Sequence, residues 1–487
     1  MDNEIKRIKS RSFLSVSSLL LQSSYSAALG FFAFFILTVK SGAHLLGIYN
    51  TVLAMMSFFN YFTNLGLAAA IVQKKEVKEE DLSTAFFIQL FLSILAVIIG
   101  FSLTNHLFKF YKDLPYRAIY LYWAVLFSFF FLSFKTIPSV LLEKKIKIYK
   151  VVFVQAIENT IFYLCVIIFS LLGFDIYSLV IAVLLRSIIG TIAIYLLNPW
   201  LPKLTFSVDS AKSLLRYGIP FQGNSFLALI KDDLLIMYLG GAIGFTNLGY
   251  VTFAKKYAEF SIRLIIDNMN RVAFPLFSRF QKDFLLLRKS LEKVLFYETL
   301  LTFPIIVGAM FIFDYLLKIV PGYFAKWNNA LFSFYFFSLS AFFISLTAPF
   351  VNLFNAIGKV KISLYFMIFW TILTWMLVPL FIRFFGYQGI SVAFFILSLS
   401  SVLVFSVAKR FVKFSSTASI KASFLSTIIM AAYLSFTRTV IFKYLNSLYV
   451  SLILSIIGAA LIYFLVVYKI RGRSVYTELL ELLKFKK

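Results

Sequence analysis

Long apolar runs separated by short polar stretches follow one another along the whole chain. A run of ~20 apolar residues is long enough to cross the hydrocarbon core of a bilayer as a helix. The runs are too long for membrane strands and lack the alternating period of a membrane barrel. We therefore expect an all-α polytopic membrane protein with about fourteen transmembrane helices, at 12–38, 45–72, 83–110, 115–142, 151–173, 176–200, 213–239, 246–278, 291–317, 328–355, 362–385, 388–411, 420–437 and 446–468.

The composition agrees with this pattern. Of the 487 residues, 61% are hydrophobic and 14% are charged, whereas soluble chains carry ~45–50% apolar residues. This excess of apolar residues excludes a soluble enzyme and a disordered chain. The first apolar run continues to Val39, which is far longer than the apolar region of a cleaved signal peptide. We therefore expect it to remain as the first helix.

The positive charge lies mainly in alternate loops. The chain has 47 Lys and Arg against 21 Asp and Glu, and 31 of the 47 fall in the N-terminus, the even-numbered loops and the C-terminal tail. Because cytoplasmic loops are enriched in Lys and Arg, we expect both termini on the cytoplasmic side of the cytoplasmic membrane. The net charge of +26 then faces anionic lipid rather than nucleic acid. With Cys165 as the single cysteine, we expect no intramolecular disulfide and no metal site.

A short motif recurs in the two halves of the chain. Leu46-Gly47-Ile48-Tyr49 opens the second predicted helix, and Leu248-Gly249-Tyr250 opens the eighth. We predict a six-helix lobe at 1–205, a second six-helix lobe at 206–413, and two additional helices with a basic cytoplasmic tail at 414–487. Secondary transporters are commonly built from such repeats, with the substrate path at the repeat interface. Residues 479–483 are either a short interfacial helix or a solvated tail.

Three stretches resemble Wzx-type polysaccharide flippases. They are residues 65–86, which include Gln73-Lys74-Lys75-Glu76; residues 214–220 with Asp232-Asp233-Leu234-Leu235-Ile236 and 239–241; and Asn270-Arg271-Val272-Ala273-Phe274-Pro275 with the residues to Arg279. The resemblance implies the fold of the MOP superfamily, with two six-helix lobes forming a V around a central cavity. It also implies export of undecaprenyl-diphosphate-linked oligosaccharide by alternating access. Family members differ in the charges of the cavity, so no site residue is carried over.

Several charged residues lie within the predicted helices, where an ionisable group costs at least ~2.5 kcal/mol. The eighth helix carries Lys255, Glu259, Arg263, Asp267 and Arg271 at steps of four, on one helical face. At 1.5 Å per residue this ladder is about 24 Å long. It either neutralises itself through pairs four residues apart, or it lines a water-filled cavity whose unpaired cations hold a diphosphate.

Other candidates come from the neighbouring helices. Lys231, Asp232 and Asp233 are expected at the depth of Lys255 and Lys256, because only a short turn at Gly240-Gly241 joins the two helices. Lys135 and Glu158 form either a salt bridge or, at Glu158, a site for a coupling ion. Arg186 has no acid nearby in sequence and is our first-lobe candidate for diphosphate, since arginine binds phosphate oxygens bidentately. The substrate-binding candidates are thus Arg186, Lys231, Lys255, Lys256, Arg263 and Arg271, and the coupling or charge-pair candidates are Lys135, Glu158, Asp232, Asp233, Glu259 and Asp267.

These features favour a transporter over an enzyme. The chain has no P-loop, no His-Glu-x-x-His pattern and no nucleophile elbow, and we expect no catalytic residues, no metal and no cofactor beyond a coupling proton or sodium ion. The main hypothesis is a lipid-linked oligosaccharide flippase for O-antigen, capsule or exopolysaccharide units, with a polysaccharide polymerase and chain-length machinery as further partners. The alternatives are a cation-coupled multidrug exporter of the same fold, a lipid II flippase and, more remotely, a polytopic glycosyltransferase or polymerase.

Overall fold

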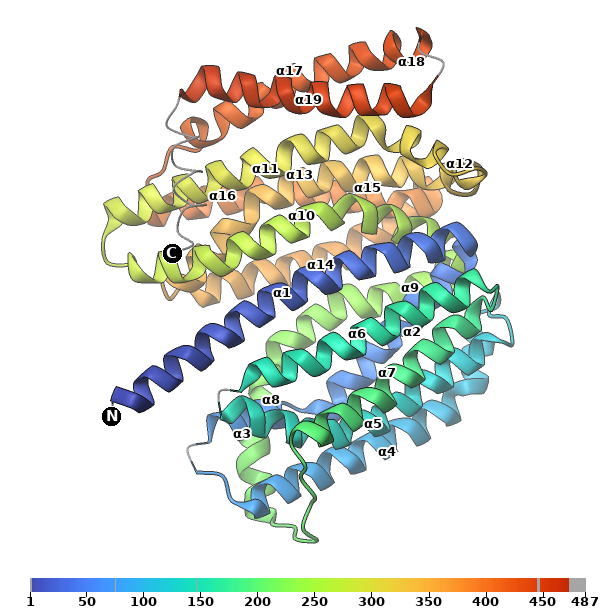
Figure 1. Cartoon of the computed structure of the whole chain (residues 1–487), viewed down its shortest axis with the longest axis vertical. Coiled ribbons are helices and arrows are strands. Elements are labelled where there is room, and N and C mark those ends of the chain that lie inside the picture. Colours follow the sequence, from blue (N-terminus) through green and yellow to red (C-terminus); the bar gives the residue numbers. More distant parts are fainter. Residues whose placement is uncertain (1, 75, 146, 445–446, 473–487) are drawn as a thin grey trace. The chain divides into compact units, whose positions relative to one another are not determined.

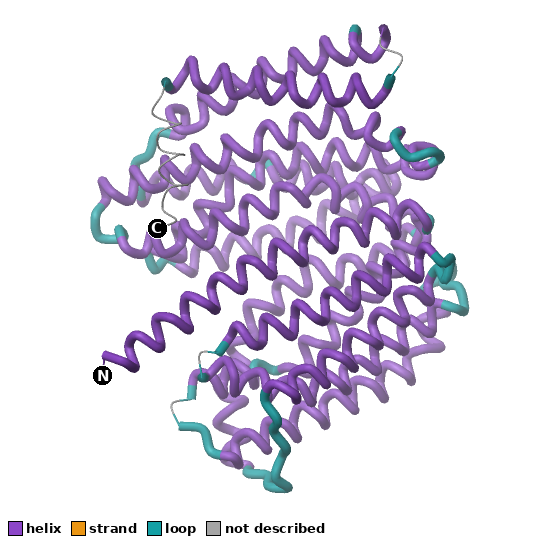
Figure 2. The backbone as a smooth tube through the Cα atoms, in the orientation of Figure 1, coloured by secondary structure: helices purple, strands orange, loops and turns teal. Residues whose placement is uncertain are grey.

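Helices account for nearly all of the computed structural model, and its described residues contain no strand (Figure 2). The structure describes residues 2–74, 76–145, 147–444 and 447–472. Within these ranges, the side chains of residues 2–17, 19, 20, 62, 224, 225, 261, 264, 271, 416, 418, 441 and 443 lie outside the description. The stretch 479–483, expected as either a short interfacial helix or a solvated tail, lies outside the described residues.

The chain folds into two compact units, Met1–Gly249 and Tyr250–Lys487. The first unit contains α1 (Asp2–Lys40), α2 (Ala43–Asn64), α3 (Leu67–Gln73), α4 (Glu79–Phe110), α5 (Ala118–Lys144), α6 (Ile148–Leu171), α7 (Ile176–Leu197), α8 (Val208–Ala228), the π-helix η1 (Leu229–Asp233) and α9 (Leu234–Ile243). Figure 1 shows these helices in blue to green.

The second unit begins inside α10 (Phe245–Arg279). It continues with α11 (Phe284–Lys318), α12 (Tyr323–Trp327), η2 (Asn328–Ala330), α13 (Leu331–Ala356), α14 (Val360–Phe385), η3 (Gly386–Gln388), α15 (Gly389–Ser398), α16 (Ser401–Phe411), α17 (Ser416–Thr439), α18 (Ile441–Tyr444) and α19 (Leu448–Arg471). The last long helices, α17 and α19, lie side by side and pack on α11 (Figure 1).

The predicted membrane architecture is confirmed. Ten segments of the described chain are long and apolar enough to span a bilayer. One of them, Val360–Phe411, contains α14 and the later pair α15 and α16, with the chain turning at Gly386. This segment therefore counts as two spans. Together with α2, the continuous α8–η1–α9 segment and α10, the set is compatible with about fourteen helices.

The boundary between the units differs from the predicted lobe boundary at residue 205. The segment α8–η1–α9 packs with the first unit, where Leu214 joins an apolar core with Leu67 and Phe86. At its other end, the Tyr111 hydroxyl donates to the Met237 carbonyl at 3.0 Å. The predicted division into 1–205, 206–413 and 414–487 rests on the sequence repeat and not on packing. It stays a prediction.

The recurring Leu-Gly motifs meet in space within the first unit. Gly47 of α2 lies against the backbone of Phe245 at the start of α10, and Gly249 of α10 lies against the backbone of Ala43 at the start of α2. A Cβ atom at either glycine would overlap the facing backbone. The two helix starts therefore cross at a reciprocal close contact, which explains why both motifs carry glycine.

Candidate functional site

In the first unit, Lys135 and Glu158 form a buried ion pair between α5 and α6. The Lys135 Nζ atom lies 2.5 Å from Oε1 of Glu158, whose residue is only 4% exposed. Gly190 of α7 lies directly against the same carboxyl group and leaves no room for a Cβ atom. Three helices therefore enclose this pair, which the sequence placed on neighbouring helices at similar depth.

Arg186 on α7 lies beside a group of aromatic side chains. Its guanidinium carbon is 5.5 Å from the centre of the Phe162 ring, close enough for a cation–π contact. Its charge also acts on the phenols of Tyr49 from α2 and Tyr163 from α6. Among the described residues, no acid forms an ion pair with Arg186, whose side chain is exposed. A cation without a carboxylate partner is suited to an anion.

Polar side chains next to this group join α1 to α6. The Asn159 amide donates to the Ser26 hydroxyl at 2.9 Å, and the hydroxyls of Tyr25 and Thr160 are 2.9 Å apart. These bonds occupy groups that a sugar could otherwise contact. Their role here is therefore to hold α1 on α6.

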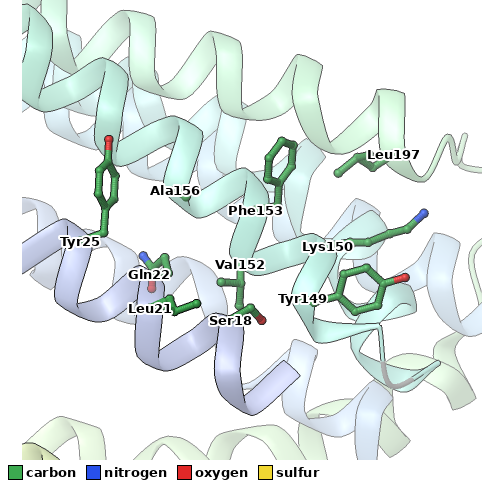
Figure 3. A pocket seen from close by; sticks show the side chains of 10 residues that line it. All are labelled: Ser18, Leu21, Gln22, Tyr25, Tyr149, Lys150, Val152, Phe153, Ala156 and Leu197. Carbon is green, nitrogen blue, oxygen red and sulfur yellow. The ribbon is translucent and has the colours of Figure 1, made fainter. Parts of the chain in front are cut away.

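A groove opens between α1, α6 and α7 on the first unit (Figure 3). Its volume is about 610 Å³, and its walls are mostly apolar, with Leu21, Val152, Phe153 and Leu197 among them. Of its described lining residues, Lys150 is the only ionisable one besides tyrosines. The groove therefore suits a hydrocarbon chain and offers few partners for a sugar.

Another feature of the first unit is the π-helix η1, which contains Lys231, Asp232 and Asp233. The Lys231 Nζ and an Asp232 carboxylate oxygen are 3.3 Å apart, while Asp233 is hydrogen-bonded to Ser57 of α2. A π-turn widens the helix by one residue, and such turns occur frequently at functional sites. The three predicted candidates thus lie at an irregular turn that apolar periodicity does not reveal.

The predicted ladder on α10 pairs only in part. The Arg263 guanidinium contacts the Glu259 carboxylate at 2.7 Å, one turn away on the same helix. Lys255 lies instead over the Phe394 ring, 4.5 Å from its centre. Asp267 is exposed and has no ion-pair partner among the described residues.

Two further candidate cations are Lys256, which lies outside the ladder, and Arg271, its last member. Lys256 has an exposed side chain, and the side chain of Arg271 lies outside the described residues. Within the described chain, no group of three or more His, Cys, Asp or Glu side chains could hold a metal ion. The described residues therefore offer cations together with carboxyl groups, most of which lie in ion pairs or hydrogen bonds.

Sequence reasoning missed a polar network at Asp81, a residue 1% exposed. Its carboxylate contacts Lys74 Nζ at 2.7 Å and accepts from the Ser210 hydroxyl at 2.7 Å and from the Lys78 backbone at 3.0 Å. Neighbouring hydroxyls of α4 accept bonds from the backbone of the 198–207 loop. In the sequence, the stretch 74–84 stands out only by its resemblance to a family, and the network gives it a structural purpose.

Comparison with known proteins identifies relatives in surface polysaccharide synthesis. The family profile described as "Polysaccharide biosynthesis protein" matches residues 44–331. The lipopolysaccharide biosynthesis protein WzxC of Escherichia coli is 22% identical over 337 residues, which is 68% of this chain and 67% of the relative. The teichuronic acid biosynthesis protein TuaB of Bacillus subtilis is 21% identical over 277 residues, and the chain spans about half of it, 56%.

Two solved transporters share the fold. An inward closed structure of the lipid II flippase MurJ aligns with a TM-score of 0.73 at 16% identity, over 94% of this chain and 99% of that one. An inward-facing multidrug resistance MATE family transporter of the MOP superfamily aligns with a TM-score of 0.65 at 17% identity, over 85% and 99%. At these identities the likeness concerns the fold alone.

Proposed function

Because this chain belongs to the polysaccharide biosynthesis protein family, we propose that it moves a lipid-linked oligosaccharide across the cytoplasmic membrane. The cargo is an undecaprenyl-diphosphate-linked repeat unit of O-antigen, capsule or exopolysaccharide. The head group crosses by alternating access while the lipid tail stays in the bilayer. The family match over more than half of the chain is the observation that carries this proposal.

The physical need for such a protein is large. A sugar head group that enters hydrocarbon loses its hydrogen bonds to water, and each unpaired polar group costs several kcal/mol. Polar side chains inside a helical bundle replace part of that hydration. The phenols of Tyr49 and Tyr163 are groups of this kind beside Arg186.

Arg186 is the residue proposed to contact the diphosphate. Its guanidinium has no carboxylate partner among the described residues, so its charge is available to a phosphate. Its position over the Phe162 ring orients the planar group without neutralising it. This favours an anionic cargo over the alternative of a cationic drug, which would need an acid rather than an arginine at this place.

Coupling to an ion gradient is part of the proposal. The first-unit candidates are Glu158, Asp232 and Asp233, and each acid has a different partner: Lys135, Lys231 and Ser57. A carboxylate that releases its lysine partner and binds a proton or a sodium ion instead changes the electrostatic attraction between the helices that carry the pair. The driving ion is therefore proposed to be H⁺ or Na⁺.

We place the chain in the cytoplasmic membrane, with both termini cytoplasmic, as a secondary transporter rather than an enzyme. Polymerase and chain-length proteins are the proposed consumers of its product. Lipid II transport is the second candidate, because the MurJ fold covers nearly the whole chain and the same diphosphate chemistry serves both cargos.

The test is complementation of a strain lacking this protein. Replacing Arg186, Arg263 or Arg271 by Ala is expected to lower surface polysaccharide by at least about tenfold, because a hydrogen bond to a charged group is worth about 1.5–3 kcal/mol. Gel filtration of each purified variant checks that it is folded. Arg186→Lys is the matched control, since it keeps the charge but loses the bidentate fork, and it is expected to be intermediate. Unchanged polysaccharide in all three Ala variants would refute the diphosphate role.

A further inference from the structure

Glu298 is a buried carboxyl group on α11 that none of the preceding chemistry uses. The residue is 0% exposed, and neither carboxyl oxygen has a hydrogen-bond partner among the described residues. It lies fourteen residues after the start of α11, which is about 21 Å along the helix at 1.5 Å per residue. It is therefore near the middle of a membrane-spanning helix.

The layers on either side of Glu298 are apolar. About one turn before it, Val294 and Leu295 pack in a cluster with Phe350 of α13. Two turns after it, Ile306 packs with Ile262 of α10 and with α13. Glu298 thus lies inside the second unit, between two well-packed layers.

The polar groups of its own and neighbouring helices are engaged with one another. The Thr299 hydroxyl donates to the Leu295 carbonyl and lies 3.2 Å from Ser423 Oγ of α17, and the Thr302 hydroxyl donates to the backbone carbonyl of Glu298. Between α10 and α13, the side-chain amides of Asn352 and Asn270 are joined at 2.6 Å. None of these hydrogen bonds involves the Glu298 carboxyl.

No charged group of the surrounding helices offsets the burial of Glu298 in the described part of the chain. On α11, Glu292 is held by Arg288 at 2.9 Å, and Asp314 by Arg438 of α17 at 2.8 Å. The remaining titratable groups are Lys289, Lys293, Tyr297, Tyr315 and Lys318 on α11; Tyr250, Lys255, Lys256, Tyr257, Glu259, Arg263, Asp267, Arg271 and Arg279 on α10; Tyr323 and Lys326 on α12; Tyr335 on α13; Lys421 and Tyr433 on α17; and Tyr449, Tyr463, Tyr468, Lys469 and Arg471 on α19.

An isolated carboxylate in such surroundings is so costly that the group takes up a proton instead. We propose that Glu298 is a proton-binding site: it carries a proton while α11 stays packed on α13, and it releases the proton when these helices separate and admit water. In that step the O–H bond breaks, the proton passes to water and the carboxylate remains. No further reactant is needed.

Proton binding at this site would couple a proton gradient to the conformation of the second unit. A proton that binds one packing arrangement more tightly than another shifts the balance between them by that difference in affinity. The link to transport rests on the proposed function, and it selects H⁺ rather than Na⁺ as the coupling ion. The proton site itself does not depend on the cargo.

Infrared spectroscopy of the full chain in lipid nanodiscs tests the site directly. At neutral pH, the wild type is expected to show the carbonyl band of a protonated carboxyl group, and Glu298→Gln is expected to remove it. Glu292→Gln is the matched control, because Glu292 lies on the same helix but is paired, and it should leave the band unchanged. A band that persists at full intensity in Glu298→Gln overturns the proposal. If Glu298→Gln does not fold, Glu298→Leu replaces it with the same expected loss.

Transport tests the coupling separately. In complemented cells, a protonophore is expected to lower surface polysaccharide severalfold in the wild type. Glu298→Gln is expected to start at that lowered level and to respond no further. Full export with full protonophore sensitivity in this variant would overturn the coupling role. If polysaccharide is unaffected by loss of the whole protein while the infrared band still depends on Glu298, the proposed function fails and the proton site stands.

Discussion

At the scale of single residues, the charges within the helices are held by three different kinds of neighbour. Lys135 meets a carboxylate, Lys255 an aromatic face and Arg186 both a ring and two phenols. Each solution lowers the cost of placing a charge at membrane depth. Lys255 and Arg186 both lack an acid partner among the described residues, but only arginine has the planar fork that binds phosphate oxygens bidentately, which is why Arg186 carries the proposed contact to diphosphate.

The buried pair of Lys135 and Glu158 gives the first residue-scale prediction. Glu158→Ala should lower the free energy of unfolding by about 3 kcal/mol, because it leaves a partly buried ammonium without its partner. The Lys135→Met and Glu158→Leu double variant should recover most of this loss, since an apolar pair of similar volume needs no desolvated charge. Thermal unfolding of the purified proteins in detergent measures both effects.

The same variants separate a structural pair from a coupling site. If the pair only holds α5 to α6, the double variant regains export together with stability. If Glu158 exchanges its lysine for a coupling ion, the double variant is stable but does not export. Equal stability of Glu158→Ala and the wild type would contradict the burial argument.

The sequence predicted partners on consecutive helices but not partners that lie far apart along the chain. Lys135 and Glu158 could be matched because each lies a similar number of residues from the loop between their helices. Lys255 could not be matched to Phe394, because nothing local indicates which helix packs on α10. Glu298 was visible as an acid within a helix, but its lack of partners among the described residues is a property of the packed core and not of the sequence.

At the scale of elements, the apolar runs predicted where helices lie but not where they are irregular. The second predicted helix is broken at Leu65 and Gly66, which both have a positive φ, and the seventh widens into η1. The apolar run continues through the first place, and the three consecutive charges at the second do not by themselves indicate a change of helical pitch. The glycine at the first break has a partner that explains it: Gly66 lies against the backbone of Gly218 on α8.

This backbone contact gives a prediction with a control on the same helix. Gly218→Ala should destabilise the protein by about 1–3 kcal/mol, because a Cβ atom there meets the carbonyl of Leu65 and forces α8 away. Gly223→Ala should be neutral or stabilising by about 0.5–1 kcal/mol, since its Cβ meets nothing within 4 Å and alanine favours the helix. Thermal unfolding of the two variants side by side is the measurement. Equal destabilisation by both would mean that helix packing, and not this contact, is responsible.

At the scale of the whole molecule, successive loops are predicted to alternate between two sets, one on each side of the membrane. The loops at 198–207 and 280–283 belong to one predicted set, and those at 111–117, 172–175 and 319–322 belong to the other. The family match and the transporter fold agree with the membrane protein and polysaccharide family that the sequence indicated. The helical fold does not indicate which side of the membrane each set faces. The predicted orientation therefore rests on the charge bias alone.

Cysteine labelling in intact cells tests this orientation. In a background with Cys165→Ala, a membrane-impermeant maleimide should label Lys112→Cys and Asn328→Cys, which are exposed positions on the predicted outer side. Thr205→Cys and Lys282→Cys, also exposed, should react only after the membrane is permeabilised. The physical reason is that 31 of the 47 basic residues lie in the N-terminus, the even-numbered loops and the C-terminal tail, and cytoplasmic loops are enriched in such charge. A fully reversed labelling pattern would show that the protein has the opposite orientation in the membrane. A pattern that changes partway along the chain would mean that one segment does not cross, which would place Arg186 or the α10 charges on the wrong side of a transport path.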